Sequence, residues 1–285
     1  TEIFAKVITS MPTEGVVSTK QLDNLVAELS AAYTGTHYDY SRFAANVAIS
    51  SYHKETLPSF SETMYKLGKD GIVNSELLKI IDTYGPEKIE EQIDYAYDYN
   101  FDFFAWKSLE KMYLLKSSEG VLTERPQHMY MRVALWVTKT FEEAIEYYQS
   151  LCNQRISPAT PIMINAGTMQ AQLSSCVLIM NEADSRQGLK SSFNDSADYS
   201  ADAAGIGLCM SNIRSKESKI ASSGGNAGGL LKYLKIINES MRFFNQQGKR
   251  PGSAAIYIEP WHKDIIDLLE LKKNTGAEEM RAKDL

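Results

Sequence analysis

The stretch QAQLSSCVLIMNEADSR, residues 170–186, decides the fold that the sequence predicts. Its polar start ends at Cys176, an apolar run follows as far as Met180, and the triplet Asp184-Ser185-Arg186 comes shortly afterwards. A short apolar run between polar segments is typical of a buried β-strand. The pattern leaves Cys176 open, because a lone cysteine there is either a small packing residue or a chemically active thiol.

Two further short apolar runs follow, at residues 205–213 and 253–260. Amphipathic segments at 185–204 and 229–246 separate the three runs, and another follows at 262–274. Short apolar runs that alternate with helical patterns predict βαβ units and a parallel sheet. The residues after Ser157-Pro158 are therefore expected to form an α/β domain.

The chain before that point is predicted to be helical. Ser18 with Gln21 three residues later is a capping-box pattern, and apolar residues from Leu22 to Tyr33 recur at helical spacing. Further helical segments are expected at residues 40–55, 75–85, 86–99, 124–137 and 140–154. The change from helical periodicity to short, strand-sized apolar runs places the main domain boundary near residue 155.

Composition excludes several classes of protein. A net charge of −6 argues against a general nucleic-acid-binding or anionic-membrane surface. No apolar stretch reaches the ~18 residues of a membrane-spanning helix. The three cysteines form no CxxC pair, which favours a reducing, cytoplasmic setting, and the four histidines lack metal-ligand spacing, so no metal site is expected.

Two loops have the composition of anion sites. Residues 213–229 are rich in glycine and small hydroxyl residues, and residues 245–254 hold Lys249 and Arg250 beside glycine and proline. Backbone N–H groups in such loops can approach a phosphate. Neither loop is a P-loop, and GIGLCM after Ala204 lacks the third glycine of a dinucleotide-binding motif. From the residues alone, each loop is either a nucleotide site or a turn.

The motifs taken together resemble a known family. RISPATPIMINAGT (155–168), QLSSCVLI (172–179), AGIGL (204–208), GKRPGSAAIYIEPWH (248–262) and DLLELKKNTGAEEMRAKDL (267–285) occur in one order. With HKET (53–56), LEKMYLLK (109–116) and ERPQHMYMRVA (124–134), they resemble the large, catalytic subunit of class I ribonucleotide reductase. The resemblance implies an α/β fold, with a helical N-terminal region followed by the first half of a ten-stranded α/β barrel.

The resemblance also implies roles for individual residues in the reduction of ribonucleoside diphosphates. Cys176 matches a redox cysteine that supplies electrons, and Thr160 and Ser175 match positions that hold the substrate. A simple turn residue is the alternative for Thr160. The matches to an allosteric effector site for a deoxynucleoside triphosphate (dNTP) are Asp184, Ser185, Arg186, Arg214, Ala221, Ser222, Gln246 and Arg250. Surface charge is the alternative for Arg214.

Residues 1–56 resemble part of an ATP-cone activity switch, in which Thr19, Asp23 and Lys54 match nucleotide contacts. The domains expected are this partial cone at 1–56, a helical domain at 57–155 and the half barrel at 156–285. Family residues that carry the radical and complete the disulfide have no match in the chain, which predicts either a fragment or one half of a split subunit.

The resemblance implies several partners and no cofactor bound by this chain itself. The radical would come from a metal-containing small subunit, thioredoxin or glutaredoxin would act as reductant, and dNTP and ATP would act as effectors. A homodimer and a complementary C-terminal half are the expected protein partners. A non-catalytic nucleotide-binding regulatory module, which keeps the effector loops, is the alternative. An allosteric binder needs no thiol beside Ser175, so Cys176 disfavours that alternative.

Overall fold

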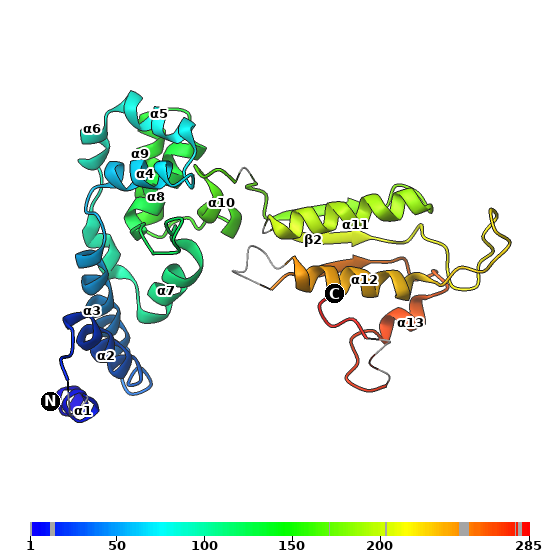
Figure 1. The fold of residues 1–285 in the computed structure, drawn as a ribbon, viewed down its shortest axis with the longest axis horizontal. Coiled ribbons are helices and arrows are strands. Elements are labelled where there is room, and N and C mark those ends of the chain that lie inside the picture. The colour runs from blue at the N-terminus through cyan, green and yellow to red at the C-terminus, as the bar shows by residue number, and fades with distance from the viewer. Residues whose placement is uncertain are drawn as a thin grey trace. The chain divides into compact units, whose positions relative to one another are not determined.

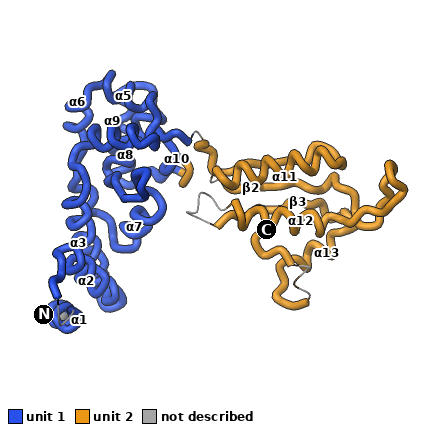
Figure 2. The backbone as a smooth tube through the Cα atoms, viewed as in Figure 1, with its two compact units in different colours: residues 1–158, 162–171 blue, residues 159–161, 172–285 orange. Residues whose placement is uncertain are grey.

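A computed structural model describes residues 2–11, 15–170, 172–202, 204–244, 251–276, 278 and 281–285. The chain forms two compact units (Figure 2). Unit 1 comprises residues 1–158 and 162–171, and unit 2 comprises residues 159–161 and 172–285. Each unit is described by itself below.

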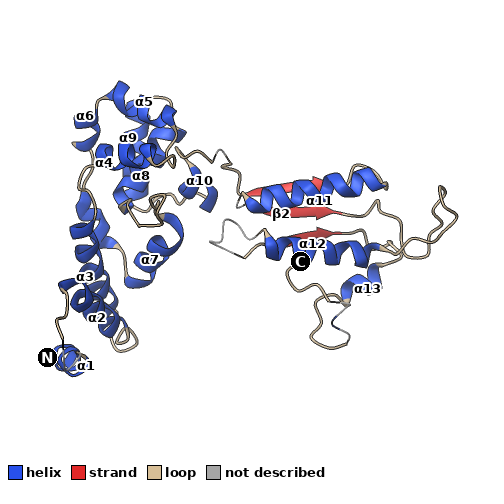
Figure 3. Ribbon diagram, in the orientation of Figure 1, coloured by secondary structure: helices blue, strands red, loops and turns tan. Residues whose placement is uncertain are grey.

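Unit 1 is helical, as the sequence predicted (Figures 1 and 3). Side-chain caps define several of its helices, because they satisfy backbone N–H groups that lack intrahelical partners. The predicted Ser18–Gln21 capping box is confirmed, and Thr140 with Glu143 forms another. The elements are α1 (Glu2–Ser10), α2 (Thr19–Ala31), α3 (Asp39–Glu55), α4 (Phe60–Lys69), α5 (Ser75–Tyr84), α6 (Pro86–Glu90), the 3₁₀-helix η1 (Tyr95–Asn100), α7 (Phe103–Ser108), the π-helical turn η2 (Leu109–Tyr113), α8 (Pro126–Val137), α9 (Phe141–Cys152) and α10 (Thr160–Asn165).

The single helix expected over residues 86–99 is wrong. α6 ends at Glu90, and a separate 3₁₀-helix begins after Asp94. The Asp94 carboxylate accepts a hydrogen bond from the Ala96 N–H at 2.9 Å. Aspartate side chains compete in this way with helical backbone bonding, so a new turn starts where the periodicity suggested continuity.

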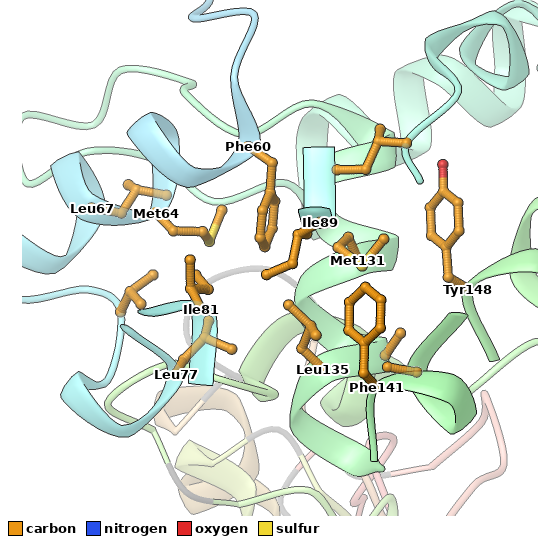
Figure 4. Close-up of a cluster of buried hydrophobic side chains, with 14 of the residues drawn as sticks. Phe60, Met64, Leu67, Leu77, Ile81, Ile89, Met131, Leu135, Phe141 and Tyr148 are labelled. Atoms are coloured by element: carbon orange, nitrogen blue, oxygen red, sulfur yellow. The ribbon is translucent and has the colours of Figure 1, made fainter. Parts of the chain in front are cut away.

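Unit 1 has one hydrophobic core, drawn in Figure 4. Phe60 and Met64 from α4 meet Ile81 from α5 and Ile89 from α6, and α8 contributes Met131 on the opposite side. These side chains are fully buried. Burial of large apolar side chains stabilises the folded state by about 1.5–3 kcal/mol each, so this cluster holds the helices together.

Unit 2 is built on a parallel sheet of β1 (Cys176–Met180), β2 (Gly205–Cys209) and β3 (Ala254–Tyr257), in the order β1-β2-β3. Helix α11 (Arg186–Ala201) connects β1 to β2, α12 (Leu230–Phe243) lies between β2 and β3, and α13 (Ile265–Leu269) follows β3. The predicted βαβ units are confirmed. With the helical unit 1, they confirm the α/β fold class.

The two faces of the sheet differ in environment. Val177, Ile179, Ile206 and Leu208 point to the face that α11 and α12 cover, and they pack there against apolar side chains of α12. On the other face, Leu178 and Met180 are 81% and 72% exposed. Cys176 shares that exposed face, because strand side chains alternate.

Candidate functional site

A pocket of about 600 Å³ lies in unit 2 at the carboxyl ends of β1 and β2. This is the usual location of ligand sites in parallel α/β sheets. Six of the residues predicted for the effector site line it, namely Asp184, Ser185, Arg186, Arg214, Ala221 and Ser222. Two loops that are separate in the sequence, one after β1 and one after β2, therefore contribute to one cavity.

An ion pair joins these two loops. Arg214, after β2, donates from Nε to Oδ2 of Asp184 at 2.7 Å and from Nη2 to the Asp184 carbonyl oxygen at 2.8 Å. Both side chains remain about one-third exposed. Within the described residues, no hydrogen bond reaches Oδ1 of Asp184 or Nη1 of Arg214. The pair thus offers an unused acceptor and unused donors to a ligand.

The amino end of α11 forms part of the pocket. Ser185 is its N-cap, and the Ser185 hydroxyl accepts a hydrogen bond from the Gly188 N–H at 3.0 Å. A Cβ at Gly188 would lie 2.2 Å from the Ala183 carbonyl oxygen, so only glycine permits this tight entry to the helix. Arg186, the first helical residue, is exposed and forms no ion pair with any described residue. Its charge and the helix dipole both favour an anion here.

The third wall is a self-supported loop. Glu217 and Ala227 are linked by a backbone hydrogen bond of 3.0 Å, and Lys219 bridges Asn226 in antiparallel fashion. Ala221 and Ser222 lie on this loop and line the pocket. The glycine-rich segment therefore forms a turn that also lines a cavity, and its role as a nucleotide site stays a prediction.

Several pocket residues were not predicted individually, although five of them lie in the loop at 213–229 that the sequence indicated as an anion site. Leu189, Ile213, Ile220 and Tyr233 supply apolar surface, and Ala227, Gly228 and Gly229 complete the lining. The Tyr233 hydroxyl donates to the Leu189 carbonyl oxygen at 2.7 Å and so ties α12 to α11. Burial raises the pKa of Tyr233 to about 12, so the hydroxyl stays protonated as a donor. The helical spacing of Leu189 after Ser185 is the one local signal that could have indicated this wall.

The predicted redox residue Cys176 and the predicted substrate residue Ser175 lie at the other end of the sheet. Cys176 is the first residue of β1, and its sulfur lies 3.8 Å from the Ser175 hydroxyl oxygen. Both residues are exposed, and Gly205 of β2 is the register partner of Cys176. Asp184 lies beyond the far end of β1, whose length from Cys176 is roughly 13 Å. Thr160 is the half-buried first residue of α10, and its substrate role stays a prediction.

The other two cysteines have different surroundings. Cys152 is buried on α9, donates to Oε1 of Gln127 at 3.1 Å, and has a pKa raised to about 11 by burial. Cys209 ends β2 and is half-buried. The Cys209 sulfur also lies 3.8 Å from a hydroxyl, that of Ser211, so what distinguishes Cys176 from the other two cysteines is its exposure.

The predicted activity-site residues lie on α2 and α3. Lys54 and Asp23 form an ion pair of 3.1 Å across the two helices, and Thr19 is the exposed first residue of α2. The structure brings Asp23 and Lys54 together, whereas their nucleotide-binding role stays a prediction. Gln246 and Arg250 lie outside the described residues.

In the part of the chain that the structure describes, no three histidine, cysteine or acidic side chains come close enough to hold a metal ion. The same residues include no helix long and apolar enough to cross a membrane.

Comparison with known proteins matches two family models to adjoining parts of the chain. The all-alpha domain of ribonucleotide reductase matches residues 99–171, and the barrel domain matches residues 174–285. The later part of the helical unit and the α/β unit thus match two different domains of one family.

Individual relatives agree with these matches. Ribonucleoside-diphosphate reductase large subunits from Danio rerio and Vaccinia virus are each 42% identical to the chain, over 296 and 280 residues. The subunit from Dictyostelium discoideum is 40% identical over 280 residues. These alignments cover 94–100% of this chain but 32–37% of the relatives, so the chain spans about a third of their length.

Proposed function

The chain belongs to the ribonucleotide reductase large-subunit family, and from this premise we propose that it forms part of an enzyme that reduces ribonucleoside diphosphates to 2′-deoxyribonucleoside diphosphates. The reaction is radical chemistry under dNTP and ATP control, and it supplies deoxynucleotides for DNA synthesis in the cytoplasm. The single observation that carries the proposal is the pocket, because six residues expected to bind the effector line one cavity.

Cys176 is one of two thiols that supply the reducing equivalents. Replacement of the 2′ C–OH bond by a C–H bond releases water and consumes two electrons and two protons, which a dithiol provides as it becomes a disulfide. Cys209 cannot be the second thiol, because it pairs in register with Met180, about 13 Å along the sheet from Cys176. The second thiol therefore belongs to another segment or chain. Thr160 and Ser175 hold the substrate through hydroxyl or backbone groups.

The pocket at the opposite end of the sheet binds the dNTP effector. Arg186 and Arg214 face the triphosphate, and Asp184 accepts a hydrogen bond from the deoxyribose hydroxyl. Leu189, Ile213 and the Tyr233 ring provide apolar surface for the base. Gln246 and Arg250 relay the identity of the effector, and Thr19, Asp23 and Lys54 contact a second nucleotide in a partial ATP cone at residues 1–56. The helical domain at 57–155 and the half barrel at 156–285 complete the proposed organisation.

The partners follow from the same premise. A metal-containing small subunit supplies the radical, thioredoxin or glutaredoxin re-reduces the thiols, and the large subunit forms a homodimer. A chain that spans about a third of its relatives also needs the remaining barrel strands, here proposed as a complementary C-terminal half. The exposed apolar face of β1, with Leu178 and Met180, is the surface that such a half would cover.

A calorimetric titration of dTTP, dGTP and dATP against the full chain tests the effector site. At least one dNTP should bind, Asp184→Ala should abolish binding, and Asp195→Ala should retain it. Asp195 is the matched control, because it is an exposed aspartate on α11 that does not line the pocket. Absence of binding by every dNTP, or equal binding by Asp184→Ala, contradicts the proposal. Turnover of CDP and GDP is then expected only when a complementary half and a small subunit are added.

A further inference from the structure

The segment that follows β3 runs beside the loop that follows β2. The Met210 N–H donates to the Tyr257 carbonyl oxygen at 3.0 Å, and the Glu259 N–H donates to the Ser211 hydroxyl at 3.0 Å. The loop after β2 carries Arg214, so these contacts continue the strand pairing towards the nucleotide pocket.

His262 and Asp264 hold the backbone on both sides of Arg214. Nε2 of His262 donates to the Ile213 carbonyl oxygen at 2.7 Å, and the carboxylate of Asp264 accepts from the Lys216 N–H at 3.0 and 3.2 Å. Nδ1 of His262 accepts from the Asp264 N–H at 3.1 Å, so the imidazole also orients the aspartate. The bond pattern requires the neutral tautomer with its proton on Nε2.

Asp264 also supplies a cap that α12 lacks. The N-cap of α12 is Gly229, which has no side chain to accept from the first helical N–H groups. Oδ2 of Asp264 accepts instead from the Leu230 N–H at 2.9 Å. Asp264 precedes its own helix α13 but makes no side-chain cap bond there, so its carboxylate serves the other helix.

The close approach of these groups depends on Gly229, a pocket residue with φ of +84°. A Cβ there would lie 2.8 Å from Cβ of Lys216 and 3.1 Å from Oδ2 of Asp264. Asp264 is 6% exposed, and its carboxylate is satisfied by backbone N–H donors, as a buried charge requires. The aspartate thus fixes two pocket walls without reaching the cavity itself, since it is not among the lining residues.

We infer that His262 and Asp264 are positioning residues of the nucleotide pocket, which tie the Arg214 loop and the amino end of α12 to the segment after β3. This inference rests on the proposed effector function and adds a physical link between the effector site and β3. The residues after Gly252 enter β3 at the end of the sheet where Cys176 enters β1, because all three strands are parallel.

The test measures dTTP, dGTP and dATP affinity in the full chain with Asp264→Asn, below the unfolding temperature of each variant. The side-chain amide is isosteric but turns one acceptor into a donor facing a backbone N–H, so affinity should fall at least tenfold. Asp267→Asn, the same change on α13, is the control and should leave affinity unchanged. A double variant with Arg214→Met should lose less affinity than the sum of the two single losses, since both changes act on the Arg214 loop. A purely structural role would instead give additive losses.

A second pair of variants keeps the test decisive if Asp264→Asn does not fold. The amide nitrogen of glutamine can occupy the place of Nε2, so His262→Gln should retain more affinity than His262→Ala. Unchanged affinity in folded Asp264→Asn, or equal affinity in the two His262 variants, overturns the inference. If the unsubstituted chain binds no dNTP, the proposed function fails and this inference fails with it. The unsubstituted chain therefore tests the function, and the variants test the positioning.

Discussion

Each unit contains an arginine–carboxylate pair, and the two pairs differ in burial and in how many of their polar atoms have partners. In unit 1, Arg132 donates to both carboxylate oxygens of Glu124, at 2.6 and 3.1 Å, and both side chains are fully buried. In unit 2, Arg214 and Asp184 are each about one-third exposed and line a cavity. The same chemistry is thus enclosed in one unit and open in the other.

The remaining hydrogen bonds show what the difference means. Arg132 also donates to the carbonyl oxygens of Ala166 and Met163, and Glu124 accepts from the Leu115 N–H. A buried pair is tolerated only when its polar atoms are satisfied in this way. The Asp184–Arg214 pair leaves polar atoms unused beside a cavity. A pair whose hydrogen-bonding atoms all have partners therefore indicates a structural role, whereas a pair with unused donors and acceptors beside a cavity indicates a binding role.

The largest expected effect is the loss of one buried partner. Arg132→Met leaves the Glu124 charge buried without compensation, so the free energy of unfolding should fall by about 3–5 kcal/mol. The matched Arg214→Met should cost less than about 1 kcal/mol, because the pair is partly exposed to water. Urea unfolding followed by far-UV circular dichroism measures both, and nucleotide titration should show weakened binding in the folded Arg214→Met chain. Similar stability losses in the two variants would refute the contrast.

The buried His128 of unit 1 provides a second test of how burial affects a charged group, through the pH dependence of stability. Burial, with a smaller contribution from Arg125, lowers the pKa of His128 from 6.5 to about 3. Between these values the unfolded chain binds a proton that the folded chain does not, so stability falls as pH decreases from about 6.5 towards 3. The slope from this group is at most about 1.4 kcal/mol per pH unit. An NMR titration should show a His128 ring that stays neutral down to about pH 4, and a midpoint near pH 6 would contradict it.

The fold was predictable where its signals are local. Strand-sized apolar runs and helical periodicity indicated β1, β2, β3, α11 and α12, and Ser18 marked the start of α2. The break at Asp94 was missed because a single side-chain hydrogen bond overrode a continuous helical pattern. Helices α4 and α7 were also missed, although Ser59 and Asp102 cap them.

The site was predictable only in part. The motif resemblance indicated the charged and polar lining of the pocket, because those residues lie in recognisable loops. Tyr233 was missed, since its place in the wall depends on how α12 crosses α11. Asp264 was missed for the same reason, because it caps a helix that begins 34 residues earlier. Contacts between distant segments depend on the path of the chain, which no local pattern records.

The smallest expected effect comes from alanine substitution of two N-cap residues, and it separates helix capping from nucleotide binding. Ser185 and Thr140 are both exposed N-caps with extended backbones, and each accepts from a backbone N–H three residues later, at 3.0 and 3.2 Å. Alanine at either position should therefore cost about 1 kcal/mol of stability. The Ser185 hydroxyl keeps its own proton free to donate into the pocket, since its oxygen is the acceptor in the cap.

Ser185→Ala should consequently weaken dNTP binding about fivefold, the cost of one hydrogen bond of roughly 1 kcal/mol, while Thr140→Ala leaves binding unchanged. Urea unfolding checks that the two stability losses match, and calorimetric titration checks that the affinities diverge. Equal affinities would show that Ser185 only starts α11. In that case Arg186, Arg214 and the helix dipole would account for anion binding. The pocket of unit 2 would then bind the nucleotide through charge, without a hydrogen bond from the Ser185 hydroxyl.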